Sequence, residues 1–354
     1  MRTPAPALLR AVFLLLLAGV LVAGCARKDP VASTKVPAFD TTVNITLIGV
    51  DRKKATRISS ILAADLAQME QEWHAWRDGG PVAHVNQRFN DGDDDFTAPP
   101  SVLSLVQLSK SLSDLSGGLF NPAIGHLYRA WGFQGRPADC LEPPPHELID
   151  QVVKAAPSMA DVHLDGIRLR SDNHLVKLDF RAIRTGFVVD QAVARLQEFG
   201  IHSASITIDG NVRAIGSRDG HPWSVPLRGP DGGGIIATVQ IKGNEAAFTA
   251  SDYRNSFTWE GRIYHDIIDP RSGYPASDTA SVTVLHSNAT TADAAATALF
   301  IAGPGDWYRV AKDMGVRYVM LTDKQGRLHM NPAMQARLRM QRGNREVIVS
   351  EPLT

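Results

Sequence analysis

The amino-acid sequence predicts an α+β fold with mostly antiparallel sheets, and two observations support this. Short runs of apolar residues bounded by Gly, Asp and Asn recur along the chain, a pattern typical of strands joined by tight turns. Segments with apolar residues at helical spacing are mixed among these runs without the regular strand–helix alternation of a doubly wound sheet. No repeat of fixed period is present in the sequence.

Composition indicates a globular protein with a sizeable core. The chain has 354 residues, of which 44% are hydrophobic and 21% are charged. Lys and Arg together number 37, as do Asp and Glu, so the formal net charge is zero. This balance argues against a nucleic-acid-binding protein, which would carry a basic surface.

The N-terminus predicts export and lipidation. Arg2 and Arg10 precede an apolar run that ends in VAGC, so residues 1–24 resemble a lipoprotein signal peptide and Cys25 is the predicted lipidation site. The body would then face the periplasm, anchored to the inner or the outer membrane. The alternative is a short uncleaved membrane anchor. Residues 25–40 are predicted to be a polar tether, and Cys140 would have no disulfide partner.

The first elements of the body are predicted from strand alternation and helix caps. Residues 41–50 alternate polar and apolar side chains and are predicted to form a strand. Asp51 is the expected N-cap of a helix that ends near Trp73. A second helix is predicted to open at Pro99-Pro100-Ser101 and to close at Gly117-Gly118.

The second half of the body is predicted to contain most of the strands. Two helices are expected here, at 188–199 before Gly200 and at 292–302 before Gly303-Pro304. Beyond the body, the basic tail 336–354 is predicted to be exposed. The predicted strands are 175–180, 205–208, 223–227, 234–241, 256–259, 281–285 and 316–321.

The segment ATTADAAATALFIAG suggests a metal site. Asp293 and Thr297 stand four residues apart, so on a helix they share one face. A carboxylate and a hydroxyl are hard oxygen ligands of the kind that Mg²⁺ binds together with water and phosphate oxygens. The alternative is structural: an Asp near a helix N-terminus is stabilised by the helix dipole, and the Thr packs.

Three further segments allow both a functional and a structural interpretation. The junction before Gly186 could bind an anion or be an ordinary turn into a helix. The Asp209-Gly210-Asn211 sequence suits a tight hairpin turn. Aromatic residues at Phe120, Tyr128, Trp131 and Phe133 could stack on a planar ring or pack in the core.

The segment YHDIIDPRSGYP could be a strand ending in a turn or one wall of an active site. Ile267 and Ile268 are predicted to anchor the strand, and Asp269-Pro270 with Ser272-Gly273 to form the turn. His265 and Asp266 are neighbours, so strand alternation sends their side chains to opposite faces. Arg271 is predicted to be structural.

Several segments together resemble the ApbE family of FAD:protein FMN transferases, over roughly Thr41 to Leu321. They occur in the family's order and are WHAWR, HVNQRFN, SGGLFNPAIGHLYRAWGF, LDFRAIRTGFVVD, ITIDGNV, AFTASDYRNSF, YHDIIDPRSGYPA and TADAAATAL. The resemblance implies a tunnelling-fold-like body of two subdomains over 41–335, with FAD in the cleft between them. It also implies Mg²⁺ on the pyrophosphate of FAD, transfer of FMN to a Thr or Ser hydroxyl of a target protein, and release of AMP.

The resemblance also implies roles for particular residues. Asp293, Thr297 and the backbone carbonyl of Ala182 match the metal ligands. The implied flavin and adenosine contacts are Tyr128, Trp131, Gly132, Phe133, Asp209 and Gly210, and the other cofactor-binding candidates are Asp179, Arg181, Thr185 and Asp252.

Departures from the family pattern fall at the same sites. Arg181 replaces a small residue, and Thr185 stands where Lys is frequent. Asp266 aligns with the family's histidine, so Asp266, or a rearranged His265, is the candidate general base. The alternative is a divergent FAD-binding protein or FAD pyrophosphatase that has no acceptor.

The resemblance also suggests the class of acceptor protein. Expected partners are membrane redox subunits of the sodium-pumping NADH:quinone reductase, Rnf or nitrous-oxide regulator type.

Overall fold

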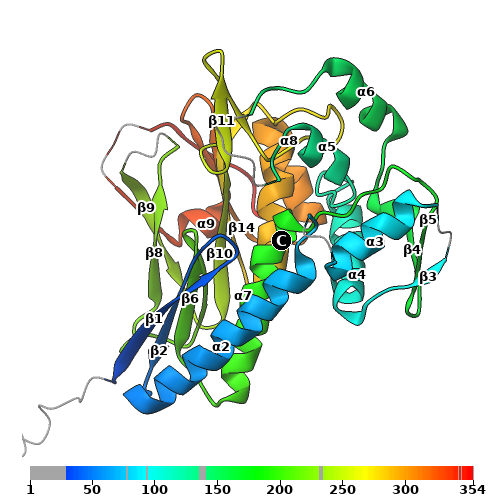
Figure 1. Ribbon diagram of the computed structural model, residues 1–354. Coiled ribbons are helices and arrows are strands. Elements are labelled where there is room, and N and C mark those ends of the chain that lie inside the picture. The colour runs from blue at the N-terminus through cyan, green and yellow to red at the C-terminus, as the bar shows by residue number, and fades with distance from the viewer. Residues whose placement is uncertain are drawn as a thin grey trace, which may run out of the picture.

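The computed structural model describes residues 29–76, 79–92, 95–134, 141–230, 234–341, 343 and 345–353. Its centre is a nine-stranded sheet of order β1-β2-β6-β7-β10-β13-β14-β15-β17 (Figure 1). Every neighbouring pair is antiparallel except β15 with β17. The strands are β1 (Val31–Ala38), β2 (Thr41–Ile48), β6 (Ala204–Ile208), β7 (Asn211–Ile215), β10 (Glu245–Ser251), β13 (Thr279–His286), β14 (Tyr318–Asp323), β15 (Leu328–Met330) and β17 (Val347–Val349).

Three long helices cover one face of this sheet: α2 (Arg52–Trp73), α7 (Arg181–Glu198) and α8 (Ala289–Asp313) (Figure 1). The Asp51 carboxylate caps α2 by accepting a hydrogen bond from the Lys54 N–H at 2.9 Å. Helix α8 is kinked at Gly303, which has a φ of 71° and precedes Pro304. The main hydrophobic core lies between these helices and the sheet.

The other face of the sheet is partly covered by a smaller antiparallel sheet of order β16-β9-β8 and by α9 (Pro332–Gln335). The strands are β8 (Trp223–Arg228), β9 (Ile235–Ile241) and β16 (Leu338–Met340). A second core, which includes Val225, Ile241 and Met330, fills the space between the two sheets.

A helical region and a separate hairpin complete the molecule (Figure 1). The helical region contains α3 (Pro81–Asn90), α4 (Pro100–Leu115), α5 (Gly125–Ala130), α6 (His146–Ala155), the short helix η2 (Met159–Asp161) and a sheet of β3 (Phe96–Thr97), β4 (Val162–Asp165) and β5 (Arg168–Ser171). The hairpin consists of β11 (Ser256–Trp259) and β12 (Arg262–His265). The predicted α+β class with mostly antiparallel sheets is confirmed.

At both ends of the body the chain forms strands that the sequence did not predict. The tether predicted for 25–40 is wrong from Val31 to Ala38, because these residues form edge strand β1 and pair with β2. An edge strand tolerates Pro37 and polar residues on its solvent side, which is why it resembles a tether. The described part of the tail from 336 is largely exposed, as predicted, but it also contributes two strands: β16 pairs with β9 in the smaller sheet and β17 pairs with β15 in the main sheet.

The region around Phe180 also differs from its prediction. Residues 175–180 form no regular strand: Lys177 makes only an isolated bridge with Ile124, and the side-chain amide of Asn86 pairs with the backbone N–H and C=O of Leu178. Helix α7 begins at Arg181 rather than at Val188. The short apolar alternation of 175–180 therefore reflects burial rather than a sheet ladder.

The predicted signal peptide and lipidation site Cys25, as well as Cys140, lie outside the described residues. Among the residues that are described, no helix is both long enough and apolar enough to span a membrane.

Candidate active site

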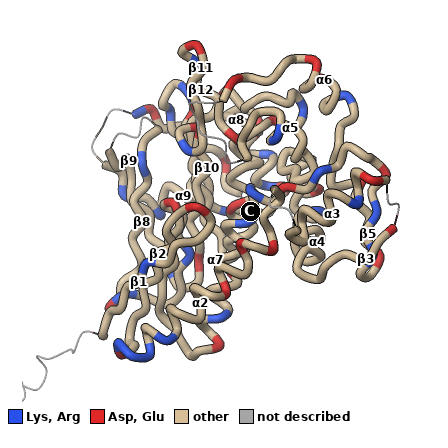
Figure 2. Tube along the Cα trace, viewed as in Figure 1, with Lys and Arg blue, Asp and Glu red and all other residues tan. Residues whose placement is uncertain are grey.

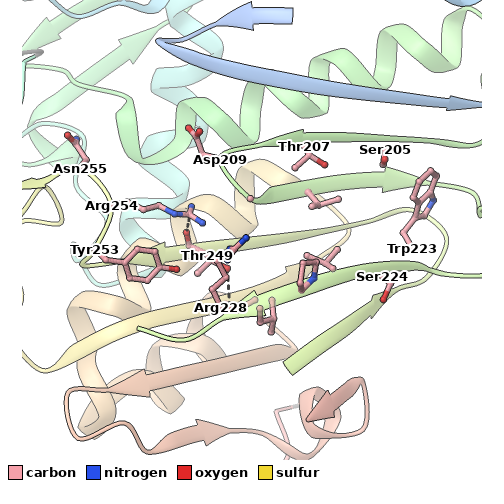
Figure 3. A pocket seen from close by; sticks show the side chains of 16 residues that line it. Ser205, Thr207, Asp209, Trp223, Ser224, Arg228, Thr249, Tyr253, Arg254 and Asn255 are labelled. Atoms are coloured by element: carbon pink, nitrogen blue, oxygen red, sulfur yellow. Dashed lines mark hydrogen bonds between the residues drawn. The ribbon is translucent and has the colours of Figure 1, made fainter. Parts of the chain in front are cut away.

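Three adjoining cavities share the side chain of Asn255, and together we call them the cleft. The first, of about 770 Å³, lies between β8 and the face of the main sheet, and Asp209 and Arg254 also line it (Figure 3). The second, of about 170 Å³, is lined by Asp266 and Asp293 among others. The third, of about 730 Å³, reaches Trp76. Asn255 lines all three, and Asp209 lines both larger ones, so the three cavities adjoin one another.

The three predicted metal ligands meet at the small cavity, where α7 and α8 cross. Ala182 lies in the first turn of α7, and Asp293 and Thr297 share one face of α8. Asp293 Oδ2 accepts a hydrogen bond from the Gly186 N–H at 2.8 Å. In a helix this N–H donates to the carbonyl four residues earlier, so Asp293 competes with the Ala182 carbonyl for it.

The donor set at this crossing fits a hard cation. It consists of one carboxylate, one hydroxyl and one carbonyl, all oxygen ligands. Burial raises the pKa of Asp293 to about 7, against the lowering effects of the Gly186 N–H and of Arg184 and Arg254. Within the described ranges, no three His, Cys, Asp or Glu residues gather to form a complete metal site.

Asp190, which we did not predict, holds the start of α8. Its carboxylate accepts hydrogen bonds from the backbone N–H groups of Ala289 and Thr290, at 3.1 and 2.8 Å, and from the Thr290 hydroxyl. Arg213 on β7 pairs with it at 2.9 Å. Asp190 thus stabilises the helix end that carries Asp293. The sequence gives no local signal for this role, because the partners lie about 100 residues away.

Asp266 and His265 face opposite sides, as strand alternation predicts. Asp266 lines the small cavity, accepts a hydrogen bond from Asn255 Nδ2 at 2.6 Å and has its pKa raised by burial. His265 is only 3% exposed. Its Nε2 lies 3.0 Å from the Ala276 carbonyl, and its Nδ1 accepts from the Ile267 N–H. Both nitrogens of His265 are engaged inside the fold, so His265 does not face the cleft in this arrangement, and of the two predicted candidates Asp266 is the one that lines it.

Arg181 contacts residues from several walls of the cleft. Its Nε and Nη2 bind the Asp179 carboxylate at 3.1 and 2.7 Å, and its Nη1 donates to the Phe133 carbonyl at 2.8 Å. The guanidinium carbon lies 4.2 Å from the centre of the Tyr128 ring, and Nη1 lies 3.8 Å from Asp266. Because Asp179 already occupies the bidentate edge, Arg181 positions its neighbours rather than offering a free fork to phosphate.

The predicted aromatic contacts divide into two groups. Tyr128 lines the small cavity and Phe133 lines the third. Trp131 is fully buried and donates its indole N–H to the Gly273 carbonyl at 2.8 Å, so it supports the turn after β12 and is not available to a ligand. Gly132 turns the chain between them with a φ of 78°.

The remaining cofactor-binding candidates also fall in different places. Asp209 and Gly210 form the β6–β7 turn, with φ angles of 48° and 79°, and line the first cavity. Asp252 pairs with Lys324 in a separate cavity, and Thr185 lies on α7 outside the residues that line the cleft.

Arg254 and Asn255 belong to the cleft but were not among the predicted site residues. Arg254 Nη1 donates to the Thr249 carbonyl at 3.2 Å, and its side chain lies across the first cavity (Figure 3). No carboxylate in the described part of the chain forms a salt bridge with it. The segment AFTASDYRNSF contains both residues, so the resemblance covered them without singling them out.

Comparisons with known proteins agree with this architecture. The ApbE family model matches residues 39–320. The chain belongs to the ApbE family. Among its relatives is the FAD:protein FMN transferase of Rhodobacter capsulatus, which is 35% identical over 92% of this chain and 62% of its own length. The Vibrio cholerae FAD:protein FMN transferase is 28% identical over 85% of this chain and 90% of its own length.

Solved structures show the same fold. The ApbE protein of Thermotoga maritima has a TM-score of 0.79 at 27% identity, covering 88% of this chain and all of its own. The Pseudomonas stutzeri flavinyl transferase ApbE has a TM-score of 0.75 at 27% identity, covering 88% of this chain and 98% of its own. The prediction that the chain belongs to the ApbE family is confirmed, and the chain spans 62% of the length of the Rhodobacter relative.

Proposed function

We propose that this protein transfers FMN from FAD to a Thr or Ser hydroxyl of an acceptor protein and releases AMP. The observation that carries the proposal is the small cavity. Asp266, a candidate base, lines the same cavity of about 170 Å³ as Asp293, Thr297 and Ala182, the candidate metal ligands. A phosphoryl transfer needs this combination of a positioned base and charge neutralisation at the phosphate.

The arrangement of the three cavities suits an elongated dinucleotide. Two larger cavities, of about 770 and 730 Å³, share Asn255 with the small one and therefore adjoin it. FAD has a ring system at each end and a pyrophosphate between them. With the pyrophosphate in the small cavity, the two ring systems would occupy the larger cavities, whose walls include Tyr253 in one and Trp76 in the other.

Magnesium fits the oxygen ligands at the α7–α8 crossing. Asp293, Thr297 and the Ala182 carbonyl would hold it. When bound, it would neutralise phosphate charge and hold the pyrophosphate in place. Arg254, whose side chain lines both the first cavity and the small one, adds a positive charge from the opposite wall.

The proposed transfer is a substitution at phosphorus. The acceptor hydroxyl oxygen forms a bond to the phosphorus of the FMN half while the bond from that phosphorus to the bridging oxygen breaks. AMP leaves with the bridging oxygen, and the hydroxyl proton passes to the Asp266 carboxylate. Asn255 holds that carboxylate in place through its 2.6 Å hydrogen bond. Because burial raises the pKa of Asp266, its ionised form is a stronger base than an exposed aspartate.

The predicted lipidation of Cys25 places this reaction at a membrane surface on the periplasmic side. The acceptors would then be exported or membrane redox subunits of the quinone reductase, Rnf or nitrous-oxide regulator type. The resemblance suggests this class of acceptor and does not name a particular protein.

The experiment that tests the proposal combines the protein, FAD, Mg²⁺ and a soluble acceptor domain, with intact mass reporting the added FMN. Asp266→Asn should slow the transfer by about 10²- to 10⁴-fold, the usual contribution of a general base, while FAD still binds. Asp266→His, which places another base there, should retain much of the rate. Asp306→Asn, on the exposed part of α8, is the matched control. Undiminished transfer by Asp266→Asn would remove Asp266 from the mechanism.

A further inference from the structure

Arg184 is a second arginine in the first turn of α7, and it lines the third cavity of the cleft. Its Nε is buried and has no hydrogen-bond partner among the described residues, and none of their carboxylates forms a salt bridge with it. Its guanidinium carbon lies 5.1 Å from the centre of the Phe39 ring, a cation–π contact that holds the group in place. Burying a charge without a partner costs free energy, so a ligand that accepts hydrogen bonds there would stabilise it.

The environment of Arg184 differs from that of Arg181, which lines the same cavity. Asp179 occupies the guanidinium edge of Arg181, whereas Arg184 has no such partner. Burial lowers the pKa of Arg184, and the carboxylates of Asp179 and Asp40 oppose this only through space. Basic and acidic residues are interspersed along the described trace, so the positive charge of Arg184 is local rather than part of a basic surface (Figure 2).

The walls of the third cavity suit a planar ring. Phe39, Trp76 and Phe133 all line it. The Trp76 indole is held from two sides, because its N–H donates to Asp179 at 2.9 Å and Lys177 Nζ lies 4.8 Å from the centre of its ring. A ring system bound among these side chains would lie in the same cavity as the Arg184 guanidinium.

The chemistry of the guanidinium distinguishes the two ring systems of FAD. A guanidinium has only donors, so it pairs with acceptors and cannot accept a hydrogen bond from the amino group of adenine. The isoalloxazine ring presents carbonyl oxygens along its pyrimidine edge, and its reduced form carries negative charge there. Arg184 is not among the residues that line the small cavity, so the pyrophosphate placed there is not its partner.

We propose that Arg184 is a specificity-determining residue that donates hydrogen bonds to the carbonyl edge of the flavin ring in the third cavity. This inference rests on the proposed function, which places FAD in the cleft. It assigns the third cavity to the flavin half of FAD and the first cavity to the adenosine half.

The test compares two ligands that share adenosine and pyrophosphate but differ in the flavin. FAD and ADP-ribose are titrated separately into the full chain with Mg²⁺, and calorimetry gives both affinities. Arg184→Met should weaken FAD binding by about tenfold or more and leave ADP-ribose binding unchanged, since it removes charge-assisted hydrogen bonds to the flavin alone. Arg195→Met, at an exposed position of the same helix, is the matched control and should bind both ligands as the wild type does.

Two further measurements separate a flavin contact from a structural role. Without ligand, Arg184→Met should unfold at the wild-type temperature or above it, because the substitution removes a buried unpaired charge. The reduction potential of bound FAD should become more negative in Arg184→Met, because a positive charge beside the pyrimidine edge favours the reduced anion. Arg184→Lys keeps the charge and should restore most of the wild-type potential.

The outcomes separate this inference from the proposed function. Equal losses of affinity for FAD and ADP-ribose in Arg184→Met would overturn the inference, because Arg184 would then contact the part that both ligands share. Wild-type FAD affinity in Arg184→Met would overturn it as well. Binding of FAD without transfer to any acceptor would overturn the proposed function alone, whereas a wild-type protein that binds no FAD would overturn both.

Discussion

Asp266 reaches the cleft because its neighbour His265 is fixed in the core. The imidazole contacts the Ala276 carbonyl through Nε2 and the Ile267 N–H through Nδ1, and its ring meets Phe300 edge-on at 5.3 Å. With both nitrogens engaged, the ring cannot rotate toward the cleft without losing two hydrogen bonds. His265 therefore acts as a structural anchor that orients the adjacent carboxylate.

The burial of His265 has a consequence for stability in acid. Burial lowers its pKa to about 4 in the folded protein, below the ordinary value of 6.5. As pH falls from about 6.5 to 4, the unfolded chain takes up a proton that the folded chain does not, so the stabilisation present at neutral pH is lost. Between pH 7 and pH 4.5 this amounts to about 2 kcal/mol of the unfolding free energy.

Urea unfolding at these two pH values tests the prediction. His265→Gln should lose about 2 kcal/mol less than the wild type on acidification, because glutamine does not titrate. His126, whose pKa burial also lowers to about 4, contributes equally to both proteins. His202→Gln, at an exposed position, should behave like the wild type. An unchanged pH dependence in His265→Gln would show that His265 does not account for the acid sensitivity.

The crossing of α7 and α8 is the element contact on which the metal site depends. Gly186 allows it, since a Cβ built there would lie 2.3 Å from the Ala289 carbonyl oxygen. The same close approach brings the Gly186 N–H to Asp293. Asp190 then fixes α8 by binding the N–H groups of its first turn.

Gly186→Ala should separate these two helices. Alanine normally favours a helix, but here the methyl group overpacks the crossing, and the expected loss of unfolding free energy is about 1–3 kcal/mol. The rate of FMN transfer should fall more than the affinity for FAD, because Asp293 and Ala182 move apart. Gly305→Ala, where a Cβ has open space on α8, is the control and should be neutral or stabilising. Denaturation midpoints and FMN transfer rates measure both effects, and full activity in Gly186→Ala would contradict them.

Local sequence rules predicted the regular elements better than the ends of the body and the site contacts. The Asp51 cap, the Asp209-Gly210 turn and the shared face of Asp293 and Thr297 depend on neighbouring residues, and the structure has all three. Strand β1 and the contact of Asp190 with α8 depend on partners elsewhere in the fold. The sequence pattern also could not distinguish Trp131, which is buried, from Phe133, which lines the cleft.

The cleft as a whole lies where the sheets, the α7–α8 pair and the helical region meet, so a ligand there should stabilise the entire fold. A ligand at 100 times its dissociation constant adds about 2.7 kcal/mol, which corresponds to a rise in Tm of about 4 °C for a body of this length. FAD should produce this rise with Mg²⁺ and a clearly smaller one with a chelator. The reason is that burial raises the pKa of Asp293 to about 7, and a bound cation would stabilise the ionised carboxylate that burial disfavours.

Thermal unfolding of the wild type and of Asp293→Ala distinguishes the metal from FAD alone. In Asp293→Ala, FAD should raise Tm only by the smaller amount that the wild type shows with a chelator, whether Mg²⁺ or chelator is present. In Asp306→Ala, the FAD-induced rise in Tm should depend on Mg²⁺ as it does in the wild type. Equal FAD shifts with Mg²⁺ and with chelator in the wild type would argue against a metal at the α7–α8 crossing. Since Asp293 and Thr297 are one helical turn apart, Thr297→Val should reproduce the Asp293→Ala result in weaker form.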